Sequence, residues 1–411
     1  MRSMHEVRKY GPSLGSVWIA PCCLLVVMFC LYAFTGLWPW HENFYNSYSL
    51  QADAWLHGRL DLGQDYPWLE LAIYQGRYYV SFPPFPSYIL LPLVAIMGVS
   101  TPDALLSLIA SLVGIALAVR IATRLCGDGP VSLFYPLYLY LGTGYLFLAH
   151  TGWVWFFAQT LCFTLCLAAI DQAQLHHGGW SLTFWACAVG CRPLVVLFLP
   201  VLILLLRRHA AEEHIPAWIC RRLYWAVGPV ILAASYMLLN GLRFGNILEF
   251  GHTYLPEFMR AEHGQFSLTY LPEHLRMLFR LPYYDPESGR LIIDSVETTL
   301  LPLENPMYLS ALIAWFLSIS ARRKSTFGSR YTLLIWIPLL LIIHMLISCM
   351  HRTLGAFQYG NRYFLDAIPF LYLGLLEWRR SDTRFDILQM PLCMLGFTLS
   401  ILGTVCTYNA W

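Results

Sequence analysis

The sequence is poor in charge. Only 12% of its 411 residues are Asp, Glu, Lys or Arg, about half the share of a typical soluble domain, whereas 58% are hydrophobic. The formal net charge is only +2, which excludes the strongly basic surface that nucleic-acid binding requires. Internal repeats and low-complexity tracts are also lacking. We therefore predict that residues 1–411 form a single membrane domain and that nucleic acid is not a partner.

Metal-ligating cysteine patterns are absent as well. The chain has 12 cysteines, but none shows C-x-x-C spacing, and most lie within apolar runs. A thiol in such a run acts as a small hydrophobic side chain. The sequence thus predicts neither a disulfide framework nor a zinc site.

Long apolar runs dominate what is present. Because a backbone in lipid must satisfy its own hydrogen bonds, each of these runs is predicted to be helical. The runs are residues 17–37, 104–122, 131–149, 153–174, 179–206, 222–240, 306–320, 331–349, 363–378 and 386–407. The first run is longer than the apolar part of a signal peptide and lacks an A-x-A cleavage site, so we expect an uncleaved span.

The distribution of positive charge fixes the expected topology. We divide residues 179–206 at Arg192-Pro193 and place residues 84–99, which begin with two prolines, on the outer surface of the membrane. The basic clusters then all face the cytoplasm: Arg2, Arg8 and Lys9; Arg120 and Arg124; Arg207, Arg208, Arg221 and Arg222; Arg322, Arg323, Lys324 and Arg330; Arg379, Arg380 and Arg384. If residues 84–99 spanned instead, Arg192 would lie in mid-bilayer, where an unpaired charge is costly.

The predicted fold is thus an all-α polytopic membrane protein with about eleven spans and amphipathic external helices in its first outer loop. We expect it in the plasma (inner) membrane with a cytoplasmic N-terminus. Two outer loops result, residues 38–103 and residues 241–305. The first concentrates acids and aromatics, and the second is rich in proline and charge, which is typical of short helices.

Three stretches carry a family resemblance: residues 38–99 (with HEN, ADAWLHGRLDL and GRYYVSFPPFP), NGLRFGNILEFGHTYLP (240–256) and GAFQYGNRYFLDAIPF (355–370). With Arg192-Pro193, they resemble the GT-C-fold polytopic glycosyltransferases, which include the polyprenyl-phosphate-mannose and aminoarabinose transferases. The resemblance implies two external helices after span one and a sugar donor carried on polyprenyl phosphate. It also implies an acid just after span one that deprotonates the acceptor hydroxyl. Glu42 stands at that place, where the family commonly has Asp.

The acid candidates are Glu42 and Asp53. If residues 42–57 are helical, the eleven-residue separation puts both on nearly one face but about 16 Å apart, so only one of them would act as the base. For the donor phosphate we select the arginines predicted at the outer boundary, whose planar fork suits phosphate oxygens. These are Arg192, Arg77, Arg362 and Arg243; further substrate-binding candidates are Tyr45, Tyr78, His252, Tyr254, Asn361 and Tyr363. The simpler alternative is an aromatic belt with snorkelling arginines.

The sequence hypothesis is an integral-membrane glycosyltransferase that moves a sugar from a polyprenyl-phosphate donor to a glycan, lipid or protein acceptor on the extracytoplasmic side. Metal-dependent members of the family place an acidic pair in the short outer loop after the third span, which in this chain follows His150 in the sequence AHTGW. This chain has none there, so we expect no obligatory metal or other cofactor, a divalent metal being the disfavoured alternative. The alternatives are a lipid-linked-sugar flippase or transporter, which usually shows inverted repeats, and an outer-face glycan polymerase or ligase.

Overall fold

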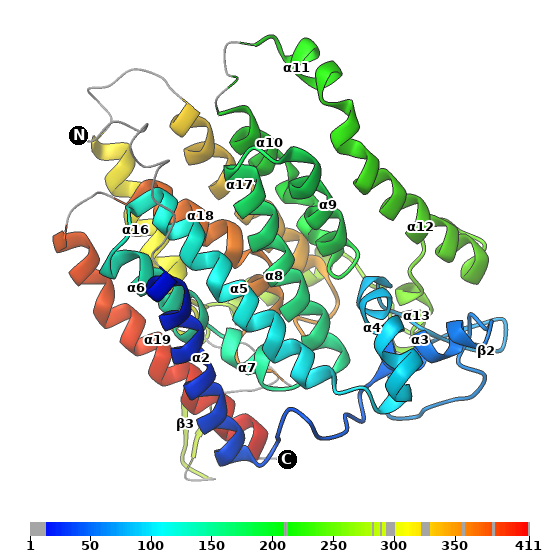
Figure 1. The fold of residues 1–411 in the computed structure, drawn as a ribbon. Helices are drawn as coiled ribbons and strands as arrows, with labels where there is room; N and C mark the ends of the chain where they lie inside the picture. The colour runs from blue at the N-terminus through cyan, green and yellow to red at the C-terminus, as the bar shows by residue number, and fades with distance from the viewer. Residues whose placement is uncertain are drawn as a thin grey trace.

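The computed structural model describes residues 14–208, 210, 213–281, 283–287, 290–292, 301–321, 329–355, 358–379 and 383–409. Within these ranges the regular structure is helical except for two short hairpins (Figure 1). Some basic residues used to predict the topology lie outside the described residues: Arg2, Arg8, Lys9, Arg322, Arg323, Lys324 and Arg380.

Among the described residues, six helices are long and apolar enough to cross a membrane. They are α2 (Leu14–Thr35), α5 (Asp103–Cys126), α8 (Val154–Gln174), α12 (Val227–Phe244, preceded by η3, Leu223–Ala226), α17 (Ser329–Met350) and α19 (Thr383–Asn409). The prediction of an all-α, multi-pass membrane protein is confirmed. The number of eleven spans stays a prediction.

The remaining apolar runs form shorter helices: α6 (Pro130–Leu141), α7 (Tyr145–His150), α9 (Gly178–Val189), η2 (Pro193–Phe198), α10 (Leu199–Arg207), α16 (Met307–Ala321), η7 (Arg362–Ala367) and α18 (Ile368–Trp378). The predicted break at Arg192-Pro193 is present. Arg192 is extended (φ −139°, ψ 101°), because a residue before proline is driven away from helical geometry. Helix α11 (Ile215–Arg221) leads into η3 at the top of Figure 1.

The first outer loop folds into α3 (Ser47–Leu56), a hairpin of β1 (Leu71–Tyr74) and β2 (Arg77–Val80), α4 (Phe85–Met97) and η1 (Gly98–Ser100). The helix predicted over residues 42–57 is wrong at its start, because α3 begins only at Ser47. Asn43 explains the late start: its side chain accepts from the Tyr45 amide at 2.9 Å and donates to the Gly152 carbonyl at 2.7 Å. Such local side-chain bonds compete with helix formation.

In its described part, the second outer loop contains short elements: η4 (His252–Tyr254), α13 (Pro256–Met259), η5 (Leu268–Tyr270), α14 (Leu271–Met277), a hairpin of β3 (Tyr283–Asp285) and β4 (Arg290–Ile292), and α15 (Leu301–Glu304). Helix α13 and the first outer loop lie at the same lower-right end of the bundle in Figure 1. Two loops far apart in sequence therefore meet at one end of the molecule.

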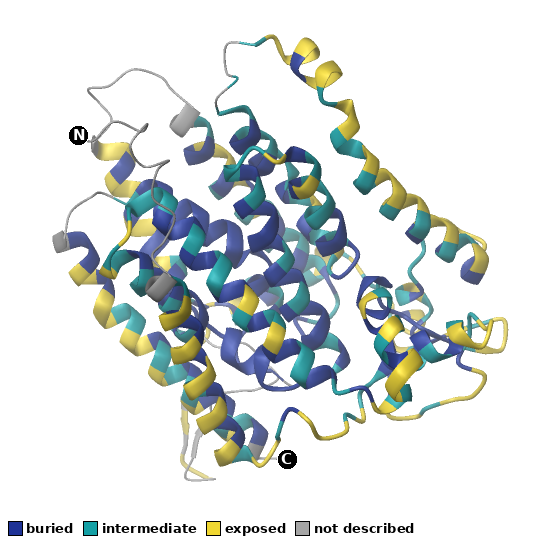
Figure 2. Ribbon diagram, in the orientation of Figure 1, coloured by how far each residue is buried: buried dark blue, intermediate teal, exposed yellow. Residues whose placement is uncertain are grey.

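Helix α8 forms the centre of the bundle. Inside the protein 83% of its apolar window is buried, compared with 17% for the window that contains α12. Figure 2 shows α8 mainly buried and α12 mainly exposed at the right of the view. The exposed apolar face of α12 is suited to contact with lipid, whereas α8 carries side chains into the protein interior.

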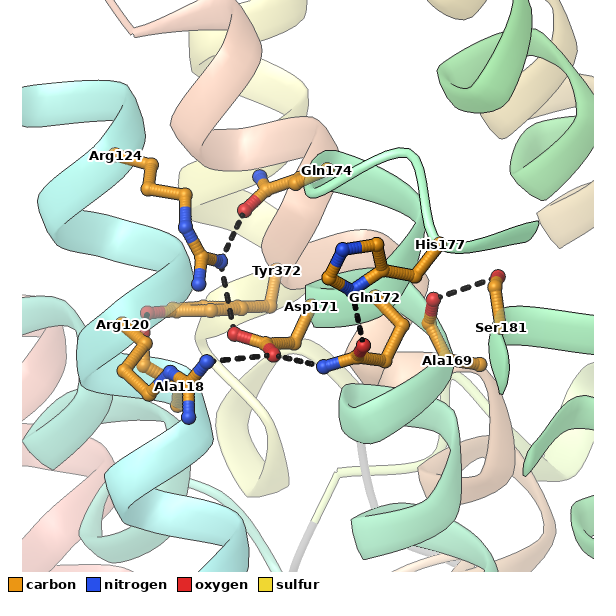
Figure 3. Close-up of polar contacts among 10 residues, drawn as sticks. All are labelled: Ala118, Arg120, Arg124, Ala169, Asp171, Gln172, Gln174, His177, Ser181 and Tyr372. Atoms are coloured by element: carbon orange, nitrogen blue, oxygen red, sulfur yellow. Dashed lines mark hydrogen bonds and ion pairs between the residues drawn. The ribbon is translucent and has the colours of Figure 1, made fainter. Parts of the chain in front are cut away.

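An ion-pair cluster joins α5 to α8 at the end of the bundle opposite the first outer loop (Figure 3). The fully buried Asp171 binds Arg124 at 2.8 Å and Arg120 at 3.2 Å, and it accepts from the side chain of Gln172 at 2.9 Å. A buried carboxylate held by two guanidiniums is a well-satisfied structural unit.

All twelve cysteines of the chain are free thiols.

Replacing Gly152 with Ala should lower the free energy of unfolding by about 1–3 kcal/mol, because overpacking forces the backbone to shift. A Cβ atom there would overlap the backbone of Asp103 and Ala104 at the start of α5. The loss is measurable as a lower thermal unfolding midpoint in detergent. Gly179→Ala is the matched control, since its Cβ would meet Trp225 no closer than 3.8 Å. An equal loss in both variants would contradict the expected overlap at Gly152.

Candidate active site

A cavity of about 360 Å³ lies where the two outer loops meet the helix bundle. Five separate segments line it: the first outer loop, the start of α8, the break between α9 and η2, the second outer loop, and the stretch from the end of α17 into η7. The lining includes Glu70, Trp155, Arg192, His252, Phe258, His351, Arg362, Tyr363 and Asp366. The cavity therefore exists only when distant parts of the sequence come together.

Arg192 enters the cavity from the helix break. Its Nε donates to Oδ2 of Asp366 at 2.8 Å, and the two side chains are 20% and 3% exposed. This bond uses one edge of the guanidinium. The guanidinium carbon of Arg192 also lies 5.3 Å from the centroid of the Tyr363 ring.

Arg362 begins η7 and is buried. Its Nη1 donates to Oε1 of Gln159 at 3.4 Å, and its carbon lies 4.9 Å from the Tyr363 centroid. Among the described residues, its Nε has no hydrogen-bond partner and no carboxylate lies within ion-pair distance of it. A buried, incompletely satisfied guanidinium is costly unless an anionic ligand completes its bonds. Arg362 and Arg192 share one aromatic ring, so the cavity presents two neighbouring cations.

Glu70 supplies a carboxylate to the cavity lining. It directly precedes β1, and its Oε2 accepts a hydrogen bond from the Trp155 indole at 2.9 Å. Burial raises the pKa of Glu70, whereas the Trp155 bond and the charge of Arg362 act in the opposite direction. A carboxylate in this setting can take up a proton from a hydroxyl group that lies close to an anion site.

The cavity histidines do not add positive charge. Burial, and then the neighbouring His351, lower the pKa of His252 to about 3, and burial lowers the pKa of His351 to about 4. Nδ1 of His252 lies 3.2 Å from the Ser81 carbonyl oxygen, so it must carry the proton. The rings of His252 and His351 lie 5.1 and 5.3 Å from that of Phe258. They form an aromatic wall, and the arginines provide the positive charge.

Four of the residues selected from the sequence line this cavity: Arg192, Arg362, His252 and Tyr363. They come from three different segments, and their convergence is the part of the expected site that the structure assembles.

The two acids selected as base candidates do not line the cavity. Glu42 is exposed in the loop before α3, where its Oε1 accepts from Ser100 at 3.1 Å. Asp53 lies on α3, 3.6 Å from Nδ1 of His57. Because α3 starts after Glu42, the two acids do not share a helix face as expected.

Other selected residues have local structural contacts outside the cavity lining. Exposed Arg77 pairs with Asp61 at 3.4 Å, and buried Arg243 donates to the Val80 carbonyl at 3.1 Å. The remaining four also contact neighbouring residues rather than the cavity. Tyr45 packs on Trp153 and Trp155, and Tyr254 packs on Tyr74. The Tyr78 carbonyl accepts a hydrogen bond from the Leu62 amide, and the Asn361 side chain accepts one from the Tyr363 amide.

Sequence reasoning did not select Glu70, Asp366, Gln159 or His351. The signal for Asp366 was available, since it is an acid near the start of an apolar run and Arg192 is the lone cation of another. Glu70 had a weaker signal, because it was one of several acids in the first outer loop. Among the described residues, no three His, Cys, Asp or Glu side chains converge as metal ligands would. Metal independence therefore stays a prediction.

Comparison with solved structures finds two kinds of similar protein. ArnT from Cupriavidus metallidurans, in a crystal structure bound to undecaprenyl phosphate, is 14% identical with a TM-score of 0.49; the match covers 87% of this chain and 59% of ArnT. The Archaeoglobus fulgidus oligosaccharyltransferase is 11% identical with a TM-score of 0.44, covering 94% of this chain and 56% of that protein. This chain thus spans less than two thirds of either. No protein-family model and no curated protein matches it.

Proposed function

We propose that this protein is a membrane glycosyltransferase that moves a sugar from a polyprenyl-phosphate donor to a hydroxyl acceptor. The reaction would take place at the end of the bundle that carries the two outer loops, facing away from the cytoplasm. One observation carries the proposal: a single cavity joins Arg362, which has an unsatisfied buried Nε, to the carboxylate of Glu70. Sugar transfer from a phosphate needs both an anion site and a proton acceptor.

In the proposed step, the acceptor oxygen attacks the anomeric carbon and the bond from that carbon to the phosphate oxygen breaks. The acceptor proton goes to Glu70, and the electron pair of the broken bond goes to the leaving phosphate. Direct displacement inverts the configuration at the anomeric carbon. Arg362 and Arg192 stabilise the negative charge that gathers on the phosphate.

The charge in the cavity stays balanced through this step. The donor is a phosphodiester with one negative charge, and Glu70 starts as a carboxylate. Afterwards Glu70 is neutral, and the lipid phosphate is a monoester that carries up to two negative charges. One negative charge has thus moved from Glu70 to the phosphate, and in the metal-independent form of the reaction Arg362 and Arg192 stabilise it there.

The proposal is tested with the purified full chain in liposomes, a labelled polyprenyl-phosphate sugar and extracted envelope glycolipids as acceptors. The expected result is labelled glycolipid together with an equal amount of released polyprenyl phosphate. Labelled donor that crosses the bilayer without release of polyprenyl phosphate would instead identify a flippase. Addition of chelator tests metal independence in the same assay.

A Glu42→Gln/Asp53→Asn double variant should keep its rate of transfer within about threefold of the wild type, since substitutions away from the site are usually near neutral. Neither side chain lines the cavity, so neither reaches the acceptor hydroxyl. The measurement is the initial rate in the liposome assay. A loss of a hundredfold would return the role of base to one of these acids.

A further inference from the structure

Asp366 is the one acid that directly contacts a cavity arginine among the described residues. Its Oδ2 accepts from Nε of Arg192 at 2.8 Å, and its Oδ1 accepts from Nε2 of Gln159 at 2.8 Å. Both oxygens are thus occupied by protein donors, and the side chain is 3% exposed. Asp366 is poorly placed to act as a base, so its influence on a ligand comes through its charge.

Gln159 extends this contact to the second arginine. Its Nε2 also donates to the main-chain carbonyl of Arg362 at 2.9 Å, and its Oε1 accepts from Nη1 of Arg362 at 3.4 Å. Gln159 is buried on α8, at the centre of the bundle. A single buried carboxylate and a single amide therefore hold both guanidiniums against the Tyr363 ring.

The unit formed by Arg192, Arg362 and Asp366 carries one net positive charge. The proposed reaction brings two phosphate ligands to it. The donor diester is singly charged, whereas the product monoester becomes doubly charged above its second pKa of about 6. A unit with one positive charge matches the donor, and a unit with two would hold the product more strongly.

We propose that Asp366 sets the charge preference of the anion site, favouring a singly charged phosphodiester donor over the doubly charged phosphomonoester product. This inference rests on the proposed function. Asp366 makes the cavity a poor trap for the product, so that polyprenyl phosphate leaves after each turnover. It is a specificity residue that acts through Arg192 and Arg362 rather than by touching the reacting atoms.

The test compares two probes by titration calorimetry on the purified full chain at pH 8. The phosphomonoester is farnesyl phosphate, and the phosphodiester is farnesyl methyl phosphate, which carries one negative charge. Asp366→Asn should bind both more tightly, and its preference for the monoester over the diester should rise by about tenfold or more, as expected for one added unit charge a few ångströms away. At pH 5 the monoester is singly charged, so the gain in preference should disappear. Asp366→Glu should keep the wild-type preference.

Asp171→Asn is the matched control. Asp171 is also a buried carboxylate between two arginines (Figure 3), but it lies near the C-terminal end of α8, which is remote from the first outer loop in Figure 1. It should lose thermal stability in the same way and leave the preference between the probes unchanged.

Three outcomes overturn the inference: an unchanged preference in Asp366→Asn, weaker binding of both probes by that variant, or an equal shift in Asp171→Asn. The failure of the proposed function is distinguishable from these. In that case the wild type releases no polyprenyl phosphate from the labelled donor in the liposome assay, whatever the two probes show in calorimetry.

Discussion

Glu70→Gln should lower the rate of sugar transfer by about 10²–10⁴-fold, the usual contribution of a positioned general base. The amide keeps the shape of the side chain and can still interact with the Trp155 indole, but it cannot accept the proton of the acceptor hydroxyl. Binding of farnesyl phosphate should be retained, because the arginines remain in place. The measurements are the initial rate of transfer and the dissociation constant of the probe.

The pH profile gives an independent check on this role. Glu70 must be ionised to act, so kcat/KM should rise with pH, and the midpoint should lie above the ordinary value for Glu because burial raises its pKa. The Trp155 bond stabilises the carboxylate, so Trp155→Phe should move the midpoint further upward. Asp65→Asn, an exposed acid of the same loop, is the control and should not move it. A full rate in Glu70→Gln would remove the proposed base.

Arg362→Ala should lower kcat/KM by about 10²–10³-fold, as expected when one preorganised donor to a developing negative charge is lost. Arg362→Lys should recover only part of the loss, because an ammonium group cannot grip phosphate oxygens as a planar fork does. Binding of farnesyl phosphate should weaken together with the rate. Transfer assays and titration calorimetry measure the two effects.

Arg77→Ala is the control for Arg362. Arg77 is exposed, pairs with Asp61 and does not line the cavity, so its loss should leave both rate and probe affinity nearly unchanged. If Arg362→Ala and Arg77→Ala behave alike, the donor phosphate lies outside the cavity described here.

Much of the fold follows from local sequence properties. The apolar runs predict the membrane helices because a backbone in lipid has no other way to satisfy its hydrogen bonds. The break at Arg192-Pro193 is equally local, since proline restricts the residue before it. Arg362 was selected because the predicted topology places it at the outer membrane boundary, with Tyr363 beside it, and the structure places both in the cavity lining.

The proposed proton acceptor, Glu70, could not be selected from local sequence properties. Glu42, Asp53 and Glu70 belong to one loop, and composition does not separate them. Their fates are decided by contacts made far away: Asn43 bonds to Gly152, which keeps Glu42 out of α3, while Trp155 of α8 bonds to Glu70. Such pairings require the tertiary structure, because the partners are separated by more than eighty residues.

The pair between Arg192 and Asp366 lies between these cases. Each is an isolated charge next to apolar sequence, which marks both as needing a partner. The sequence does not say that they partner each other, since 174 positions separate them. Their contact follows from how η2 and η7 pack against each other.

The cavity lining, which comes from five segments of the chain, has a consequence for biosynthesis. The ribosome has delivered both outer loops and most of the membrane helices before it reaches Arg362, Tyr363 and Asp366. A nascent chain that stops before this point already contains Glu70 and Arg192, but it lacks Arg362 and the Tyr363 ring that both arginines contact. The proposed anion site is therefore complete only after η7 has been translated and has packed against the rest of the cavity lining.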